Sequence, residues 1–105
     1  MGLIAREIEA AGVPTLAMTS AWDITRAVQP PRSAYVHRPL GHQTGTPGSL
    51  RSQVDTVRAA LEAAPEIARG EIRDLGRDWG SPGWEARAYT PEETPVGPDG
   101  KPLRD

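Results

Sequence analysis

Cysteine and phenylalanine are absent from this chain of 105 residues, and only two histidines are present. Without cysteine the chain itself cannot form a disulfide, a thiolate metal site or a cysteine nucleophile. The two histidines, His37 and His42, would need carboxylates to complete a zinc site. A metal-dependent enzyme built on both is one hypothesis, but they would project differently, from the end of a strand and from a loop.

Long apolar runs and an excess of basic residues are also lacking. No stretch of about 18 apolar residues is present, so we expect no transmembrane helix. The N-terminus has no basic region followed by an apolar core, so we expect no secretory signal. The net charge is −2 with both signs interspersed, whereas a nucleic-acid or membrane surface needs a basic patch. We therefore expect a cytoplasmic protein that binds neither nucleic acid nor a membrane.

Apolar residues and prolines are unevenly distributed. Most aliphatic residues lie within residues 1–64, and five of the eleven prolines lie within residues 80–105. A core of about 65 residues is marginal by itself, so the chain is expected to depend on a partner or on its own copy. We predict an α/β half-domain over 1–64, followed over 65–105 by a short helix and an extended Pro/Gly-rich tail. The tail carries three aromatic residues that either fold back over the half-domain or bind a partner as an arm: Trp79, Trp84 and Tyr89.

Helical and strand patterns alternate along the half-domain. The predicted elements are a helix over 1–12, a strand over Thr15–Thr19, a helix over Ala21–Val28 that begins with a capping box at Ser20, a strand over Ser33–Val36 and a helix over Leu50–Ala64. This alternation predicts an α/β fold, namely a partial parallel-sheet, Rossmann-like half-domain. Two strands cannot close a core, so another chain is expected to extend the sheet.

The helix over 50–64 has the clearest amphipathic pattern, and Ser49 is a suitable N-cap for it. Its aliphatic residues recur at helical spacing and are predicted to lie buried against the sheet: Leu50, Val54, Val57 and Leu61. Residues 66–75 repeat this pattern weakly as a second helical segment, in which Gly70 lowers the helix propensity.

The loop over 38–49 joins the second predicted strand to this helix. It contains three glycines and lies beyond the C-terminal end of a strand, where α/β sheets bind ligands. The free N–H groups at the start of the following helix favour an anion or a carboxylate. The alternative is a connector rich in turn residues, because Gly, Pro and Ser dominate turns.

Four segments of the chain resemble, in the same order, the glycine/sarcosine/betaine/D-proline reductase family of selenoprotein B type: residues 2–15, 23–32, 39–48 and 50–61. The first segment reads GLIAREIEAAGVPT, and the third begins Pro-Leu-Gly-His. The resemblance covers residues 2–64, and residues 66–105 match nothing in the family.

The resemblance implies an α/β protein of reductive amino-acid metabolism, in which a cysteine or selenocysteine cleaves a C–N bond of an activated substrate. That residue would lie upstream of Met1, so we expect it in another chain and expect this chain to be inactive alone. No cofactor is expected in this chain; a thiol, selenol or other redox group would come from the partner.

The resemblance also carries site residues over to the loop, as candidates for binding the substrate or transferring a proton: Gly41, His42, Thr44 and Gly45. His42 is the candidate general acid for a leaving amine, because histidine titrates near neutral pH. Independently of the resemblance, Arg32 and Arg38 flank the second predicted strand and are candidates for holding a substrate carboxylate. Structural alternatives apply to the histidine and to both arginines, since a loop histidine often bonds nearby backbone and such arginines are often solvated or paired at the surface.

Two functions of different classes remain open. The first is a small subunit of a heteromeric reductase-like enzyme that acts on an amino acid or related small amine. The second is a non-catalytic binding or assembly subunit that kept the fold and lost the chemistry. A co-purifying chain that bears the missing half and a cysteine or selenocysteine would favour the first. A stable homo-oligomer without a pocket at His42 would favour the second.

Overall fold

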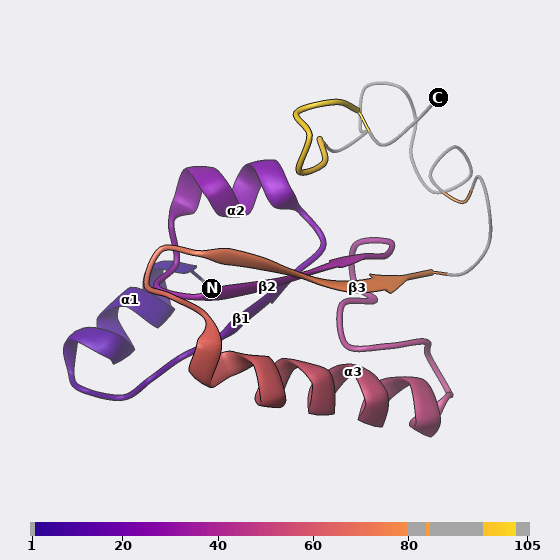
Figure 1. Ribbon diagram of the computed structural model, residues 1–105, viewed down its shortest axis with the longest axis horizontal. Coiled ribbons are helices and arrows are strands. Elements are labelled where there is room, and N and C mark those ends of the chain that lie inside the picture. The colour runs from indigo at the N-terminus through magenta and orange to yellow at the C-terminus, as the bar shows by residue number, and fades with distance from the viewer. Residues whose placement is uncertain (1, 80–83, 85–95, 103–105) are drawn as a thin grey trace.

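The structure is a computed structural model that describes residues 2–79, 84 and 96–102 of the chain. Within them three parallel strands form one open sheet in the order β1-β2-β3 (Figure 1). The elements along the chain are α1 (Gly2–Ala10), β1 (Ala17–Thr19), α2 (Trp22–Val28), β2 (Ser33–His37), α3 (Leu50–Ala63), the 3-10 helix η1 (Ala64–Glu66) and β3 (Ile72–Asp78). Figure 1 shows α2 on one face of the sheet and α3 on the other. The predicted α/β class and parallel sheet are confirmed, with three strands in place of two.

β2 is the central strand and the most buried part of the fold. Ala34, Tyr35 and Val36 are almost inaccessible to solvent, because both faces of the sheet carry a helix. The ring of Trp22, at the start of α2, meets the Tyr35 ring edge-on, with centroids 5.2 Å apart and planes at 87°. The end of β2 is therefore a fixed point from which His37 and the following loop extend.

The third strand corrects the prediction of a helix over residues 66–75, which is wrong. β3 pairs in parallel with β2, and the backbone N–H of Ser33 donates to the carbonyl of Glu71 at 3.1 Å. Gly70, with φ +84°, turns the chain toward the sheet, and its N–H donates to the carbonyl of Pro31 at 2.6 Å. The sheet therefore includes a strand that follows residue 64, the predicted end of the half-domain.

The aliphatic row of α3 corrects a second prediction. Leu50 is 74% exposed, Val54 43%, Val57 42% and Leu61 67%, so the row does not lie buried against the sheet of this chain. The buried face carries the smaller residues Thr56 and Ala60. Small side chains let a helix pack closely, and the buried residue of α1 is likewise small, namely Ala5.

The helix caps agree with the sequence in one case and differ in another. The Ser49 side chain accepts a hydrogen bond from the backbone N–H of Ser52 at 3.2 Å, which confirms the predicted N-cap of α3. The capping box predicted at Ser20 is wrong, because the N-cap of α2 is Ala21, which makes no side-chain cap. Instead the hydroxyl of Thr19 accepts from the Ala21 N–H at 2.9 Å. Most of the predicted tail, Tyr89 included, lies outside the described residues.

Glu9 ties α1 to the rest of the fold. Its carboxylate accepts from the Arg32 guanidinium at 2.6 Å and from the Thr15 hydroxyl at 2.9 Å, and its side chain is 8% exposed. The hydrogen bond from Arg32, followed by those from Thr15, outweighs the effect of burial and lowers the pKa of Glu9 below its usual range. The folded chain therefore stabilises the carboxylate form of Glu9 more than the unfolded chain does.

We expect this pair to make stability depend on pH in acid. Because the folded pKa is the lower one, the contribution is fully present above the ordinary glutamate pKa of about 4.3 and is lost as pH falls through the folded pKa. Urea unfolding at a series of pH values should show a steeper acid loss for the native chain than for Glu9→Gln. The exposed Glu7→Gln on the same helix is the control; an acid loss equal in all three proteins would contradict the prediction.

Candidate functional site at the carboxyl edge of the sheet

The carboxyl ends of the three parallel strands meet at one edge of the sheet. A shift in register between Tyr35 and His37 brings His37, the last residue of β2, opposite Asp78, the last residue of β3. The loop over 38–49 leaves from the same edge. The sequence prediction that this loop follows the C-terminal end of a strand is thus confirmed, and the edge is where α/β sheets hold ligands.

His37 and Asp78 form a polar pair at this edge. The Nδ1 atom of His37 lies 3.0 Å from Oδ2 of Asp78, and the Trp84 indole N–H donates to Oδ1 of the same carboxylate at 3.3 Å. Trp84 is only 3% exposed, and its ring lies 5.0 Å from the His37 ring. A carboxylate on Nδ1 fixes the orientation of an imidazole.

His42 lies in the loop and contacts a second tryptophan. Its ring centroid is 5.0 Å from that of Trp79, with the planes at 61°. The N–H of His42 donates to the carbonyl of Pro39 at 3.0 Å, and its own carbonyl accepts from Gly45 N–H at 3.3 Å, so two turns hold the residue. Its Nδ1 atom is buried and has no hydrogen-bond partner among the described residues. The Trp79 indole therefore contacts the imidazole of His42 without occupying its Nδ1 atom.

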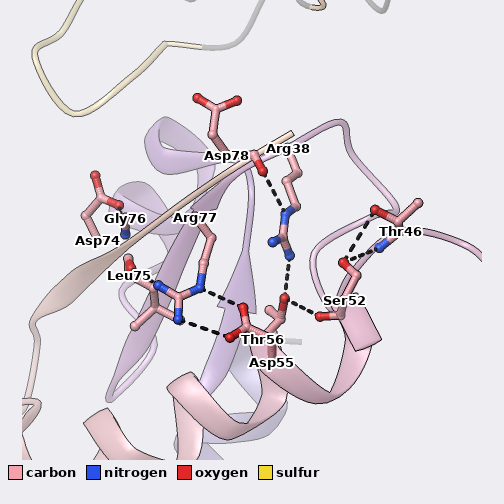
Figure 2. A network of polar contacts seen from close by, with 10 residues as sticks. All are labelled: Arg38, Thr46, Ser52, Asp55, Thr56, Asp74, Leu75, Gly76, Arg77 and Asp78. Atoms are coloured by element: carbon pink, nitrogen blue, oxygen red, sulfur yellow. Dashed lines mark hydrogen bonds and ion pairs between the residues drawn. The ribbon is translucent and has the colours of Figure 1, made fainter. Parts of the chain in front are cut away.

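Arg38 is directed into the chain, as Figure 2 shows. Arg38 is only 6% exposed. One guanidinium nitrogen donates to the Thr56 hydroxyl at 2.7 Å, and Nε makes a long contact of 3.5 Å with the carbonyl of Asp78. Burial, and then the nearby charge of Arg77, lower the pKa of Arg38. The guanidinium predicted to hold a substrate carboxylate is thus engaged between α3 and the end of β3.

Arg77 makes a second connection between the same two elements (Figure 2). Its guanidinium donates to the two carboxylate oxygens of Asp55 at 2.9 and 3.4 Å. The Thr56 hydroxyl that accepts from Arg38 also donates to the carbonyl of Ser52 at 2.9 Å. These contacts fix α3, and with it the end of the loop, relative to the carboxyl edge.

The other predicted loop residues differ in their surroundings. Gly45 is buried with φ +135°, and a Cβ at this position would lie 2.8 Å from both the Cα and the N of Gln53. The close approach that favours glycine here is therefore to α3. Gly41 has φ +92° with open space around it, and Thr44 is exposed. The loop presents Gly41 and Thr44 to solvent and uses Gly45 for packing.

Three residues of this edge were not predicted as site residues: Asp78, Trp79 and Trp84. The only signal in the sequence was the presence of tryptophans in a segment rich in proline and glycine. Of the two alternatives considered for these aromatic residues, the structure places Trp79 and Trp84 against the histidines of the same chain.

The described residues contain no group of three or more His, Asp or Glu side chains able to hold a metal ion. None of the helices in that part of the chain is both long and apolar enough to span a bilayer. Comparison with protein-family models, with curated proteins and with solved structures gave no match. The chemistry at hand is that of two imidazoles, one carboxylate and two indole rings, which suits proton transfer beside an apolar wall.

Proposed function

We propose that this chain is the small subunit of a heteromeric reductase-like enzyme that acts on an amino acid or a related small amine. Another chain supplies the reactive cysteine or selenocysteine, which cleaves the C–N bond with two electrons from a thiol or selenol donor. This chain supplies a Rossmann-like half-domain whose carboxyl edge lines the site. The substrate class and the reaction rest on the resemblance of residues 2–64 to the reductase family.

The observation that supports this proposal is the gathering of proton-transferring groups at the carboxyl edge of an open parallel sheet. His37 and His42 both lie there, each beside a tryptophan, and Asp78 orients His37. A chain without cysteine can provide such groups but not the nucleophile. In this division of labour His42 protonates the leaving amine, while the partner's thiolate or selenolate attacks the substrate carbon.

The test is the activity of the assembled complex isolated from its source, measured as amine release from candidate substrates in the presence of a dithiol. His42→Ala should lower turnover by about 10²-fold if His42 transfers a proton in the rate-limiting step. Assembly should survive, because the side chain is half-buried in a loop and contacts mainly Trp79. Gln43→Ala, its neighbour in the same loop, is the matched control and should leave turnover unchanged.

Subunit stoichiometry, measured on the same samples, separates the outcomes. Unchanged turnover in the His42 variant would remove it from the mechanism. Loss of assembly would make it an interface residue. A co-purifying partner without any reactive cysteine or selenocysteine would overturn the proposed division of labour itself.

A non-catalytic assembly subunit is the second candidate, and two observations favour it. Arg38 is engaged with Thr56, and Gly45 is required for packing against Gln53, so two of the predicted site residues have structural roles. This candidate would be supported over the first by a stable homo-oligomer that forms no heteromeric complex and that becomes less stable when His42 is replaced by alanine.

A further inference from the structure

The outer face of α3 carries an exposed row of aliphatic side chains. Its four residues, Leu50, Val54, Val57 and Leu61, are each at least 42% exposed. Their spacing of four, three and four residues is that of a coiled-coil seam, which packs against one partner helix. Val54, Val57 and Leu61 also border a hollow of about 530 Å³. Exposed apolar patches of this kind mark interaction sites.

The charges along the row indicate what kind of helix fits. Arg51 and Arg58 occupy successive positions on the same flank of the seam, and neither makes an ion pair within the described residues. Asp55, farther around the helix, is already paired with Arg77. Glu62, four residues after Arg58, also borders the hollow but lies one position farther from the seam. The position directly beside the seam is therefore basic, and carboxylates on a partner helix would complement it.

A second copy of this chain fits poorly. When two copies pair antiparallel through the row, Arg51 of one copy lies beside Arg58 of the other, so that two contacts between like charges flank the seam. Parallel pairing offers Arg58 only the uncharged Gln53. The described residues of the C-terminal segment, 96–102, do not cover the row either, because they lie on the α2 side of the sheet, away from α3 (Figure 1).

We propose that the outer face of α3 binds a helix of a different protein chain, with apolar residues in a seam and carboxylates along the flank that faces Arg51 and Arg58. This inference deepens the proposed function, on which its biological setting rests, by naming the surface that joins the subunits. It makes no use of the carboxyl edge, so it can hold even where the reductase chemistry fails.

The probe is a pair of synthetic helical peptides that share a leucine seam and differ only on the flank, one with glutamates and the other with lysines. The full chain should bind the glutamate peptide roughly tenfold or more tightly than the lysine peptide, a difference of about 1.4 kcal/mol. Arg51→Glu combined with Arg58→Glu should reverse the preference. Fluorescence anisotropy at low and high salt measures both, and the preference should shrink in high salt.

Val57→Asp should weaken binding of the glutamate peptide by roughly tenfold or more, because it places a charge in the seam. Its matched control is Ile24→Asp, an exposed aliphatic residue on α2 at the other face of the sheet. Circular dichroism melts confirm that both variants fold. Equal binding of the two peptides, binding unaffected by Val57→Asp, or no binding of either peptide would overturn the proposal. So would sedimentation evidence of a homodimer that Val57→Asp dissociates, since the occupant would then be a second copy.

Discussion

Replacing Gly45 by valine should abolish the cooperative unfolding transition of the chain. Any side chain at this position places a Cβ atom 2.8 Å from the Cα and N of Gln53, in the first turns of α3, and must adopt a φ of +135°. Overpacking and backbone strain each cost about 1–3 kcal/mol, and their sum approaches the whole stability of a small domain, about 5 kcal/mol. The backbone of α3 cannot move away easily, because Arg38 and Arg77 hold this helix to the sheet.

Gly41→Val is the matched control for this prediction. Gly41 lies in the same loop with φ +92°, but a Cβ added there would meet no atom within 4 Å. This variant has the backbone strain without the clash and should keep a cooperative thermal transition at a lower temperature. Circular dichroism melts of the two variants compare them directly. Equal melting temperatures would show that the approach of the loop to α3 is looser than described.

Local signals in the sequence were sufficient where neighbouring residues decide the structure. The helix over 50–63 follows from its spacing and from the Ser49 cap, and β2 from a short apolar run between turns. β3 could not be recognised in this way. Its half-buried positions include Arg73 and Arg77, whose charged heads hide the alternation of a strand, and its Ile and Leu happen to be three residues apart. Pairing with β2 decides its conformation, and that contact is not local.

The orientation of α3 shows a second limit of sequence patterns. An amphipathic pattern reveals that a helix has an apolar side but not which surface covers that side. Here the sheet takes the face with Thr56 and Ala60, and the aliphatic row faces outward. The prediction that the sheet of this chain buries the row is therefore wrong. The prediction that the fold needs another chain stays a prediction, and the exposed row gives it a specific surface.

Only the part of the candidate site that is formed by one continuous loop could be predicted from the sequence. The loop with His42 was recognised because glycines, a histidine and a helix start lie close together in the sequence. The pairing of His37 with Asp78 spans 41 residues and depends on β3, so no local pattern could reveal it. The same reason explains why Trp84 was not expected beside Asp78, whose carboxylate it contacts from a segment that reads as a linker.

Arg38→Ala should destabilise the chain by about 3 kcal/mol, the second largest loss expected. The substitution removes a hydrogen bond from a charged donor, worth about 1.5–3 kcal/mol, together with the packing of a long buried stem. It also removes the contact that joins Thr56 of α3 to the carbonyl of Asp78 at the carboxyl edge. Urea unfolding measures the loss. Arg26→Ala, an exposed arginine on α2, is the control and should change stability by less than about 0.5 kcal/mol.

Arg38→Met separates the two contributions. Methionine keeps most of the buried stem and removes the charge, and exchanging a buried charged group for an apolar one is often nearly neutral. This variant should therefore recover at least about half of the loss seen with alanine. Combining Arg38→Met with Thr56→Val should give a coupling energy of about 1 kcal/mol or more in a double-mutant cycle, because the two side chains share a hydrogen bond of 2.7 Å. Additive effects would mean that the bond contributes nothing to stability. Arg38 would then be free to turn toward a substrate carboxylate, the role that its place at the end of β2 suggests.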